Sequence, residues 1–538
     1  MSALGGVACG YRIRIEHLQL LIRHLAHEPA PSRDRRQLGL VVLCAAMFIS
    51  AVDSTIVNVA LPAIARDLDA RFGALQWVID GFLVCLAGML LVGSGLADHF
   101  GRRRVFLLGL AGFGATSLLA ALSQNVAELI AARVLMGAAA ACVLPPALSL
   151  IAVMFSPQER PRALAVWAAV AGVGLALGPV LGGVLVQSVG WQAVFLVNVP
   201  VVIAAAPLGV LSLPESRRPG APPLDLIGAG LSFLALSLVV FALIDGVHLG
   251  WSNLAVLVAA AGGLAAGVAF VGVELVRRAP LFDVTALLRP VVATGALVIL
   301  AVYIAFLGVL FLLPQYLHYV RHTSTLFSGL ALAPLGLGTL VAAPLVPRLI
   351  GVAGRRVTIA AGLAAMSASV ALLLLIHRAT GRLFVLIGAA VFGAMIPVTL
   401  VPATGAIMTD LGEEKAGDGG AINQFARQVG GAFGVAIIGS VFAAVYAHRV
   451  EAELGGFSAA ARRQAGESIE RAQALVARTG PELHNQLFAR IDHSFDVAAR
   501  VGFAVIVALL IAVAAAAMLG LASPGTPEVT PHRVVTDA

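Results

Sequence analysis

Fourteen runs of roughly twenty apolar residues fill the chain from Leu38 to Leu521, separated by short joints rich in arginine or in glycine and proline. Each run is long enough to cross the hydrocarbon core of a bilayer. Hydrophobic residues make up 60% of the 538 residues and charged residues only 12%. A soluble core cannot bury that much apolar surface, so lipid is expected to be the main solvent of the fold.

Spans of this length are expected to be α-helices, because a barrel strand needs only about ten residues of alternating character. The sequence therefore predicts an all-α polytopic membrane protein. The predicted spans are 38–61, 75–97, 105–123, 127–150, 163–187, 193–213, 224–244, 252–276, 291–313, 326–347, 357–377, 383–408, 421–446 and 498–521.

The arginine distribution predicts that both termini are cytoplasmic, because positive charge is retained on that side of a membrane. With the N-terminus inside, Arg33, Arg35 and Arg36 precede the first span on the inner side. The inner loops then hold Arg102, Arg103, Arg104, Arg160, Arg162, Arg217, Arg218, Arg277, Arg278, Arg289, Arg348, Arg355, Arg356 and Lys415. The short outer loops hold only Arg66, Arg71, Arg321, Arg378 and Arg382.

The net charge of +7 does not indicate nucleic acid as a partner, because the basic residues lie at membrane edges, where lipid headgroups explain them. The four cysteines lack metal-ligand spacing, and His318 with His322 has no further acidic or cysteine ligand nearby. We expect neither a disulfide nor a metal site. No catalytic cluster and no cofactor-binding motif is visible in the sequence.

Three charges lie well inside predicted spans: Asp53 in the first, Asp80 in the second and Arg133 in the fourth. A charge at a helix centre costs about 2.5–3.5 kcal/mol on insertion scales, so each is a functional candidate. Their depths allow one cluster, in which movement of Arg133 toward or away from Asp53 would control proton binding. The alternative is a permanent ion pair that holds spans 1 and 4 together.

The loop between spans 2 and 3 carries Asp98, Gly101, Arg102 and Arg103. Gly101 permits a tight turn, and Asp98 at a helix end needs a nearby cation, so a breakable charge pair could act as an inner latch. The alternative is ordinary positive-inside arginine beside a turn glycine. Arg348 to Arg356 repeats the glycine and arginines between spans 10 and 11, with Gly351 in the place of Asp98, which hints at an internal repeat.

Span 5 contains Gly174, Gly178 and Gly182 at intervals of four, so these glycines share one helix face; Pro179 and Gly183 lie beside them. Small residues let two helices approach closely, and Pro179 introduces a bend. This face is predicted to pack closely and to repack during transport, or alternatively to form a static contact. Asn423 and Arg427 lie near the inner end of span 13. Most of the acids at span edges, Asp225, Asp245, Glu274 and Asp410, are interpreted as solvated caps.

Together these segments resemble the major facilitator superfamily, specifically its fourteen-span drug:proton antiporter family. Asp53 to Pro62, including Asn58, resembles the family's span 1 signature, and Asp98 to Arg103 resembles the superfamily's inner-loop motif. Leu129 to Gly137 is similar to the span 4 motif. Gly174 to Gly183 resembles the antiporter motif, which is typical of exporters, and Asn423 to Gly434 reads like the family's span 13. Departures from the usual motif residues are Ser94, His99, Met136 and Gln192.

The resemblance implies a major facilitator fold of two six-helix bundles with two inserted helices, and alternating access between the bundles. Protons would enter while a drug-like or antibiotic amphiphile leaves across the cytoplasmic membrane, with the proton gradient as energy source. The implied segments are an N-terminal tail 1–37, bundles 38–213 and 291–521, inserted helices 224–276, an outer loop 448–496 and a C-terminal tail 522–538.

Two other functions stay open. One is a narrow exporter of a single endogenous metabolite or antibiotic, and the other, more distant, is a membrane-embedded enzyme or receptor. An ATP-driven pump is unsupported, because the only lysine, Lys415, precedes alanine and so forms no phosphate-binding GK[ST] motif. If Asp53 and Asp80 face the substrate they favour cationic or zwitterionic compounds; if they serve only protons, that preference disappears.

Overall fold

The computed structural model describes residues 33–217, 225–277, 283–374, 382–412, 415–479 and 481–521. The predicted C-terminal tail and residues 1–32 of the predicted N-terminal tail lie outside these ranges. Residues 33–37 of that tail belong instead to the first described helix, α2 (Arg33–Asp67). We call the side at which α2 begins the inner side and the opposite side the outer side.

Helices account for nearly all of the described chain, as a fold in lipid requires. The first spans are built from α2 and from α3 (Phe72–Phe100), α4 (Arg102–Ala121), α5 (Val126–Ala141), α6 (Leu144–Met154), α7 (Arg160–Ser188), α8 (Ala193–Leu196) and α9 (Asn198–Ser212). Two helices follow, α10 (Leu226–Leu249) and α11 (Leu254–Val276). The remainder consists of η1 (Val284–Leu288), α12 (Pro290–Tyr319), α13 (Thr325–Ala342), η2 (Ala343–Leu345), α14 (Val346–Leu374), α15 (Arg382–Leu411), α16 (Ala416–Glu453), α17 (Ala459–Glu467), α18 (Ile469–Val476) and α19 (Pro481–Gly520).

The described residues contain 13 continuous helical stretches that are long and apolar enough to cross a membrane. One of them, Thr325–Leu374, has 50 residues and is too long for one crossing at about 1.5 Å per residue. The 3₁₀ turn η2 and the non-helical Gly354 (φ 74°) interrupt it. It therefore provides two crossings, and the predicted fourteen spans are confirmed.

The predicted span 127–150 is broken into two helices, and prolines explain the break. Helix α5 ends at Ala141, and α6 begins again at Leu144 with Pro145 and Pro146 in its first turn. A proline ring lacks the N–H donor and clashes with the preceding turn, which interrupts a helix. The fourth crossing is therefore a pair of helices joined at Cys142 and Val143.

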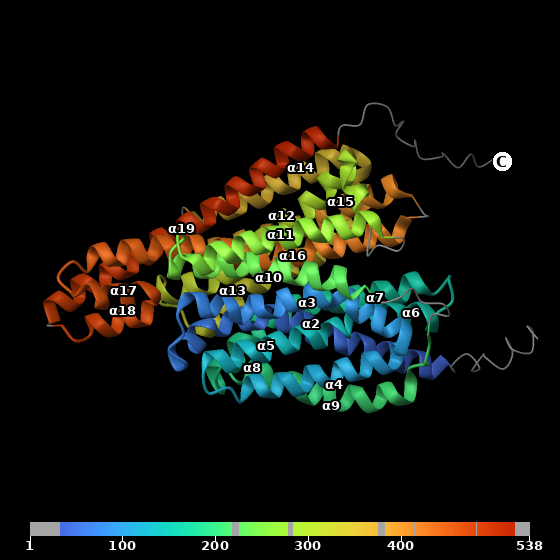
Figure 1. Ribbon diagram of the computed structural model, residues 1–538, viewed down its shortest axis with the longest axis horizontal. Coiled ribbons are helices and arrows are strands. Elements are labelled where there is room, and N and C mark those ends of the chain that lie inside the picture. The colour runs from blue at the N-terminus through green and yellow to red at the C-terminus, as the bar shows by residue number, and fades with distance from the viewer. Residues whose placement is uncertain are drawn as a thin grey trace, which may run out of the picture.

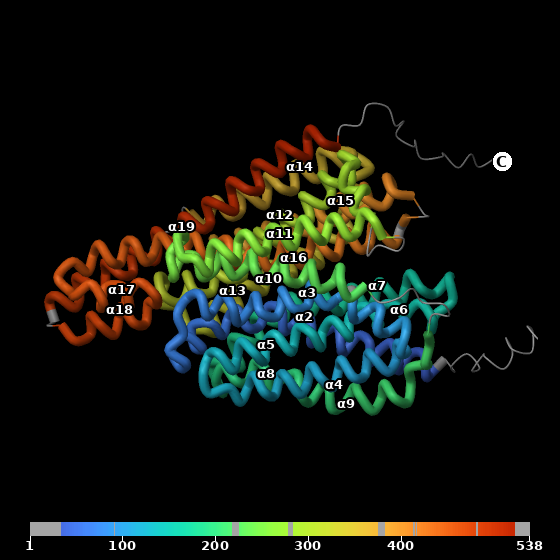
Figure 2. Tube along the Cα trace, viewed as in Figure 1, coloured from blue at the N-terminus to red at the C-terminus, as the bar shows by residue number. Residues whose placement is uncertain are grey.

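The helices before α10 and those after α11 form two groups that repeat the same pairing, consistent with the internal repeat hinted at by the two glycine-arginine loops. Figures 1 and 2 show the groups as a blue-to-teal layer and a layer that runs from green to red. Helix α10 contacts α3 of the first group and α16 of the second, and α11 packs on α10. In the first group the contacting pairs are α2 with α7, α2 with α9, α3 with α5, α4 with α5 and α4 with α9. In the second group the corresponding pairs are α12 with α16, α12 with α19, α13 with α15, α14 with α15 and α14 with α19.

Two reciprocal contacts join the groups: α7 packs on α13, and α3 packs on α16. Gln76 of α3 donates to the carbonyl oxygens of Val435 and Ala436 at 3.1 and 3.2 Å. Near the outer side, the Phe72 ring lies 5.1 Å from the Phe442 ring. At the inner side the described ion pairs each stay within one group or within the α10–α11 pair, for example Arg36–Glu159 and Lys415–Asp283. The groups are therefore held together toward the outer side.

The predicted outer loop 448–496 is helical over most of its length. Helix α16 continues to Glu453 and α19 begins at Pro481, with α17 and α18 between them. Figure 1 shows these short helices extending beyond the bundle, opposite the end where α2 begins and α19 finishes. Arg471 of α18 pairs with Asp69, in the α2–α3 connection, at 3.0 Å. This outer subdomain, residues 448–496, therefore contacts both groups.

Candidate functional site

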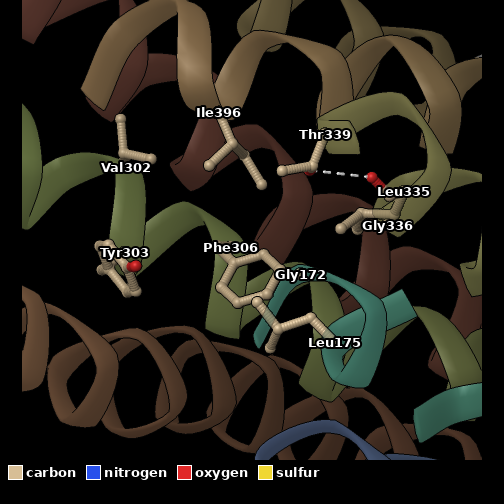
Figure 3. A pocket seen from close by; sticks show the side chains of 9 residues that line it. All are labelled: Gly172, Leu175, Val302, Tyr303, Phe306, Leu335, Gly336, Thr339 and Ile396. Atoms are coloured by element: carbon tan, nitrogen blue, oxygen red, sulfur yellow. Dashed lines mark hydrogen bonds between the residues drawn. The ribbon is translucent and has the colours of Figure 1, made fainter. Parts of the chain in front are cut away.

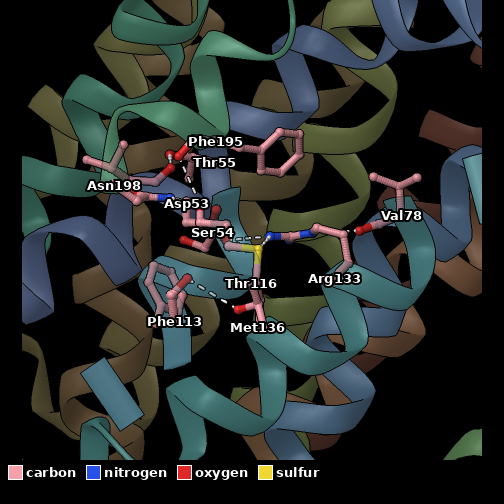
Figure 4. A network of polar contacts seen from close by, with 12 residues as sticks. Asp53, Ser54, Thr55, Val78, Phe113, Thr116, Arg133, Met136, Phe195 and Asn198 are labelled. Atoms are coloured by element: carbon pink, nitrogen blue, oxygen red, sulfur yellow. Dashed lines mark hydrogen bonds and ion pairs between the residues drawn. The ribbon is translucent and has the colours of Figure 1, made fainter. Parts of the chain in front are cut away.

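A buried ion pair lies inside the first group of helices. Nη1 of Arg133 on α5 lies 2.6 Å from Oδ2 of Asp53 on α2, and the two side chains are 1% and 0% exposed. Figure 4 shows the guanidinium reaching across from α5 to the carboxylate. The other carboxylate oxygen, Oδ1, accepts no hydrogen bond from any described residue. The sequence prediction that these two charges meet is confirmed.

Arg133 has contacts beyond Asp53. Its Nε donates to the carbonyl oxygen of Val78 on α3 at 2.9 Å, and its guanidinium lies 4.4 Å from the centre of the Phe82 ring. A backbone carbonyl and an aromatic face both stabilise a cation in a dry environment. The arginine is therefore anchored to α3 independently of the carboxylate. If Asp53 loses its charge, Arg133 still has the Val78 carbonyl and the Phe82 ring as partners.

Asp80 and Asn58 do not join this pair, so the predicted cluster of three charges is wrong. Asp80 is fully buried and neither carboxylate oxygen has a hydrogen-bond partner among the described residues. It shares a face of α3 with Gln76, one turn away, which binds α16. Asn58 is also fully buried and donates to the carbonyl of Ser54 on its own helix at 3.3 Å. In this conformation neither side chain lines an open cavity.

The glycine face of α7 packs against α2 at the level of Asp53. A Cβ added to Gly178 would lie 2.0 Å from Oγ1 of Thr55, and one added to Gly182 would lie 2.9 Å from Ile56. Gly174 is equally close to Ala51. The predicted close crossing therefore exists, and its partner is the helix that carries the buried carboxylate.

The neighbouring face of α7 packs on α13 of the second group. A Cβ on Gly329 would lie 2.2 Å from the carbonyl oxygen of Pro179, and one on Gly336 would lie 2.2 Å from Cβ of Ala176. Gly183 meets Leu326 in the same way. One helix thus connects the environment of Asp53 to the interface between the two groups.

The inner-loop motif forms a compact charged turn. Asp98 and Arg102 pair at 2.9 Å, and Gly101 between them has a φ of 110°, which disfavours any residue with a Cβ. Arg103 binds Glu215 through its backbone N–H at 3.2 Å. Glu215 also lies 3.6 Å from Arg104. Sequence analysis missed Glu215, because a loop acid that follows a span has no signal of its own.

The second inner loop repeats the backbone but not the charges. Gly354 has a φ of 74°, like Gly101 at the matching place. A Cβ on Gly351, which stands in the place of Asp98, would meet nothing within 4 Å. Arg355 donates to Oγ1 of Thr409 at 3.1 Å, so it is held by a hydroxyl where Arg102 is held by a carboxylate.

Asn423 and Arg427 lie one turn apart on α16. Nδ2 of Asn423 donates to Oγ1 of Thr404 at 2.5 Å. The Arg427 guanidinium is exposed and lies 5.0 Å from the centre of the Tyr303 ring on α12. These two side chains belong to the second group and do not reach the Asp53–Arg133 pair.

Two of the four span-edge acids, Asp245 and Glu274, are buried, so the interpretation as solvated caps is wrong for these two. Asp245 of α10 is 7% exposed and accepts a hydrogen bond from Nε1 of Trp77 at 3.0 Å, which ties α10 to α3. Glu274 of α11 is 3% exposed. Among the described residues, no group of three or more His, Cys, Asp or Glu side chains could hold a metal ion.

Known proteins resemble this chain along most of its length. Residues 43–435 match the family model described as "Major Facilitator Superfamily". The tetracenomycin C resistance and export protein of Streptomyces glaucescens is 33% identical over 94% of this chain and 95% of its own length. The multidrug resistance protein Stp of Mycobacterium tuberculosis (strain CDC 1551 / Oshkosh) is 32% identical over 83% of this chain and 82% of its own.

A solved structure shares the fold at low sequence identity. A bacterial homolog of the human lysosomal transporter Spinster, crystallised in an inward-facing and occupied conformation, superposes with a TM-score of 0.63. It is 17% identical and covers 91% of this chain and 97% of its own. This similarity supports the arrangement of the helices and carries no information about the substrate.

Proposed function

Because the chain belongs to the Major Facilitator Superfamily, we propose that it is a proton-coupled antiporter that exports drug-like or antibiotic amphiphiles across the cytoplasmic membrane by alternating access. The observation that carries the proposal is the buried Asp53–Arg133 pair. The names of the relatives, one an antibiotic resistance and export protein and one a multidrug resistance protein, support export as the direction of transport.

The pair offers a place for a proton. Oδ1 of Asp53 is buried and has no hydrogen-bond partner among the described residues. A proton bound there turns the carboxylate into a neutral carboxyl group and so removes the negative charge that Arg133 neutralises. Arg133 keeps the Val78 carbonyl and the Phe82 ring when the carboxylate is lost. Protonation therefore weakens the link between α2 and α5 while the arginine stays in place.

The packing of α7 offers a route from the proton site to the interface. Protonation of Asp53 frees α2 to shift, and α2 is in close contact with the glycine face of α7. The other face of α7 packs on α13 of the second group. A small displacement at Asp53 can thus change how the two groups pack, because tightly packed interfaces move between discrete arrangements.

The described conformation fits the inward-facing state of such a cycle, with the groups joined toward the outer side. The two groups would act as the two moving bundles, and α10 and α11 would follow them as inserted helices. A membrane potential of 100 mV supplies about 2.3 kcal/mol per proton charge, so no cofactor is needed. The cytoplasmic position of both termini follows from the arginine distribution.

Export rather than catalysis agrees with the fold and with the relatives, which are transporters. Narrow export of one metabolite or antibiotic would use the same pair and the same route. It differs from broad efflux only in the range of compounds accepted, which a panel of substrates measures directly.

The test is uptake of three fluorescent amphiphiles, one cationic, one anionic and one neutral, into inverted vesicles with an acidic interior. At least one dye is expected to accumulate, and an uncoupler is expected to abolish the accumulation. Asp53→Asn should also abolish it, whereas Asp67→Asn, an exposed acid on the same helix paired with Arg66, should not. Uphill accumulation that survives in Asp53→Asn contradicts the coupling role. If none of the dyes is taken up under the proton gradient, the narrow exporter becomes the hypothesis to test next.

A further inference from the structure

A pocket lies between the two groups of helices, next to the interface of α7 and α13. Its first-group wall is Gly172 and Leu175 of α7. Its second-group wall is Val302, Tyr303, Phe306, Leu335, Gly336, Thr339 and Ile396, from α12, α13 and α15. Figure 3 shows the Phe306 ring beside Leu175, with Tyr303 at one edge. The lining is apolar and aromatic, and both groups contribute to it, so it changes shape when they move.

The polar groups of this pocket are few. Oγ1 of Thr339 already donates to the carbonyl oxygens of Leu335 and Gly393. The Tyr303 hydroxyl makes no hydrogen bond with any described residue. Gly336 does not widen the pocket, because a Cβ there would lie 2.2 Å from Cβ of Ala176 on α7. The flat walls are the rings of Tyr303 and Phe306, and a flat ring system fits a recess with aromatic walls better than a branched aliphatic chain does.

One cation lies beside Tyr303, a residue that lines the pocket. Arg427 lies over the Tyr303 ring, is exposed, and forms no ion pair with any described carboxylate. A ligand cannot contact Asp53 or Asp80 in this conformation, because both are 0% exposed. Asp53 is also neutralised by Arg133. Arg427, near the inner end of its span, is thus a charge that a compound bound in the pocket can reach.

We propose that this pocket is a substrate site and that Arg427 makes it select planar aromatic compounds that carry a negative charge. The rings lie against Tyr303 and Phe306, and a carboxylate, sulfonate or phenolate accepts hydrogen bonds from the guanidinium, which is suited to planar anions. A cation at the same place is repelled. This inference rests on the proposed export function, and it reverses the cationic preference that applies if the span acids face the substrate.

The test is binding to the purified full-length protein in lipid nanodiscs, without any ion gradient. Fluorescein and rhodamine 123 share one three-ring skeleton and differ in charge, the first anionic and the second cationic. Fluorescence anisotropy should show fluorescein bound about tenfold or more tightly than rhodamine 123, the difference expected from one charge-assisted hydrogen bond. This comparison uses the wild-type chain and does not depend on a variant that folds.

Variants assign the preference to Arg427. Arg427→Gln should weaken fluorescein binding about tenfold and leave rhodamine 123 unchanged or tighter, and Arg427→Lys should restore part of the loss. Tyr303→Phe should retain both dyes, whereas Tyr303→Ala should weaken both. The matched control is Arg382→Gln, since Arg382 lies 4.7 Å from the centre of the Phe327 ring on another part of the fold; fluorescein binding should not change.

Equal affinity of the wild type for the two dyes, or fluorescein binding unaffected by Arg427→Gln, overturns the proposal. Failure of proton coupling would leave these results intact, because the binding assay contains no gradient. Conversely, Asp53→Asn should fail to accumulate fluorescein whatever affinity the wild type shows for it. The two proposals can therefore fail separately.

Discussion

The two groups of helices share a backbone plan and differ in where they hold charge. Both inner loops turn at a glycine of positive φ, Gly101 and Gly354. In the first group, α2 and α5 meet through the buried Asp53–Arg133 pair. Helix α12, the counterpart of α2, contains no Asp, Glu, Lys or Arg, and Arg427 of the second group is exposed on α16. The repeat thus supplies the scaffold, and under the two proposals the first group holds the proton site and the second holds the cation that faces the substrate.

Removing the buried arginine should have the largest effect on the free energy of unfolding. Removing the exposed arginine should have only a small one. Arg133→Leu leaves Asp53 buried without compensation and should lower the free energy of unfolding by about 3–5 kcal/mol. Arg427→Leu removes a stacking contact and should cost less than about 1 kcal/mol. Thermal unfolding in nanodiscs measures both.

The double variant Asp53→Asn, Arg133→Leu is the control for this comparison. It removes both charges, so it should recover much of the stability that Arg133→Leu loses, while transport stays absent. If Arg427→Leu destabilises the protein as much as Arg133→Leu, the division of roles between the groups is wrong.

Glycine substitutions separate packing within a group from packing between groups. Gly178→Ala places a methyl 2.0 Å from Thr55 within the first group and should destabilise the fold by about 1–3 kcal/mol. Gly336→Ala places a methyl 2.2 Å from Ala176 across the interface. It should instead shift the protein toward a conformation that is open at the outer side, because the groups can part there without unfolding.

Spin labels at the exposed positions 67 and 463, in a chain without its four cysteines, report this opening as a longer mean distance. The control is Gly230→Ala on α10, where a Cβ meets nothing within 4 Å. An unchanged distance in Gly336→Ala would show that the contact between α7 and α13 does not hold the outer side closed.

The two inner turns should respond unequally to the same change. Gly354 has φ 74° and ψ 162°, a backbone conformation essentially confined to glycine, so Gly354→Ala should lower stability by about 1–3 kcal/mol. Gly101→Ala should lower it further, because its Cβ would also lie 2.6 Å from Oε1 of Glu215. Thermal midpoints of the two variants test the order, and the matched Gly351→Ala, where a Cβ meets nothing within 4 Å, should be almost neutral.

The sequence predicts what lipid dictates and fails where the rotation of one helix against another decides the outcome. Spans of about twenty apolar residues and a buried Asp53–Arg133 pair follow from the energy of burying polar groups in hydrocarbon. Whether Asp80 faces Arg133 or α16 depends on how α3 is rotated, which no local pattern records. Glu215 and Gln76 were missed because each is informative only through a partner far away in the chain.

The connection between the last two crossings differs most between the groups. In the first group α7 and α8 are joined by residues 189–192, whereas in the second α16 and α19 are joined by the outer subdomain. There the Glu470 carboxylate accepts hydrogen bonds from Ser468, at 2.6 Å, and from Tyr319 of α12. This subdomain therefore adds a titratable contact outside the membrane that the first group lacks at the corresponding place.

The smallest expected effect is a pH dependence of stability from that contact. Burial raises the pKa of Glu470 above its ordinary value of 4.5, although the two hydrogen bonds act in the opposite sense. The folded protein then binds more protons than the unfolded chain between pH 4.5 and the raised pKa, so this contribution to stability is full below pH 4.5 and is lost as the pH rises. Glu470→Gln should flatten this part of the thermal-midpoint profile between pH 4 and 7, whereas Glu482→Gln, an exposed acid at the start of α19, should leave the profile as it is. A profile unchanged by Glu470→Gln would mean that the outer subdomain docks on α12 through its apolar contacts alone.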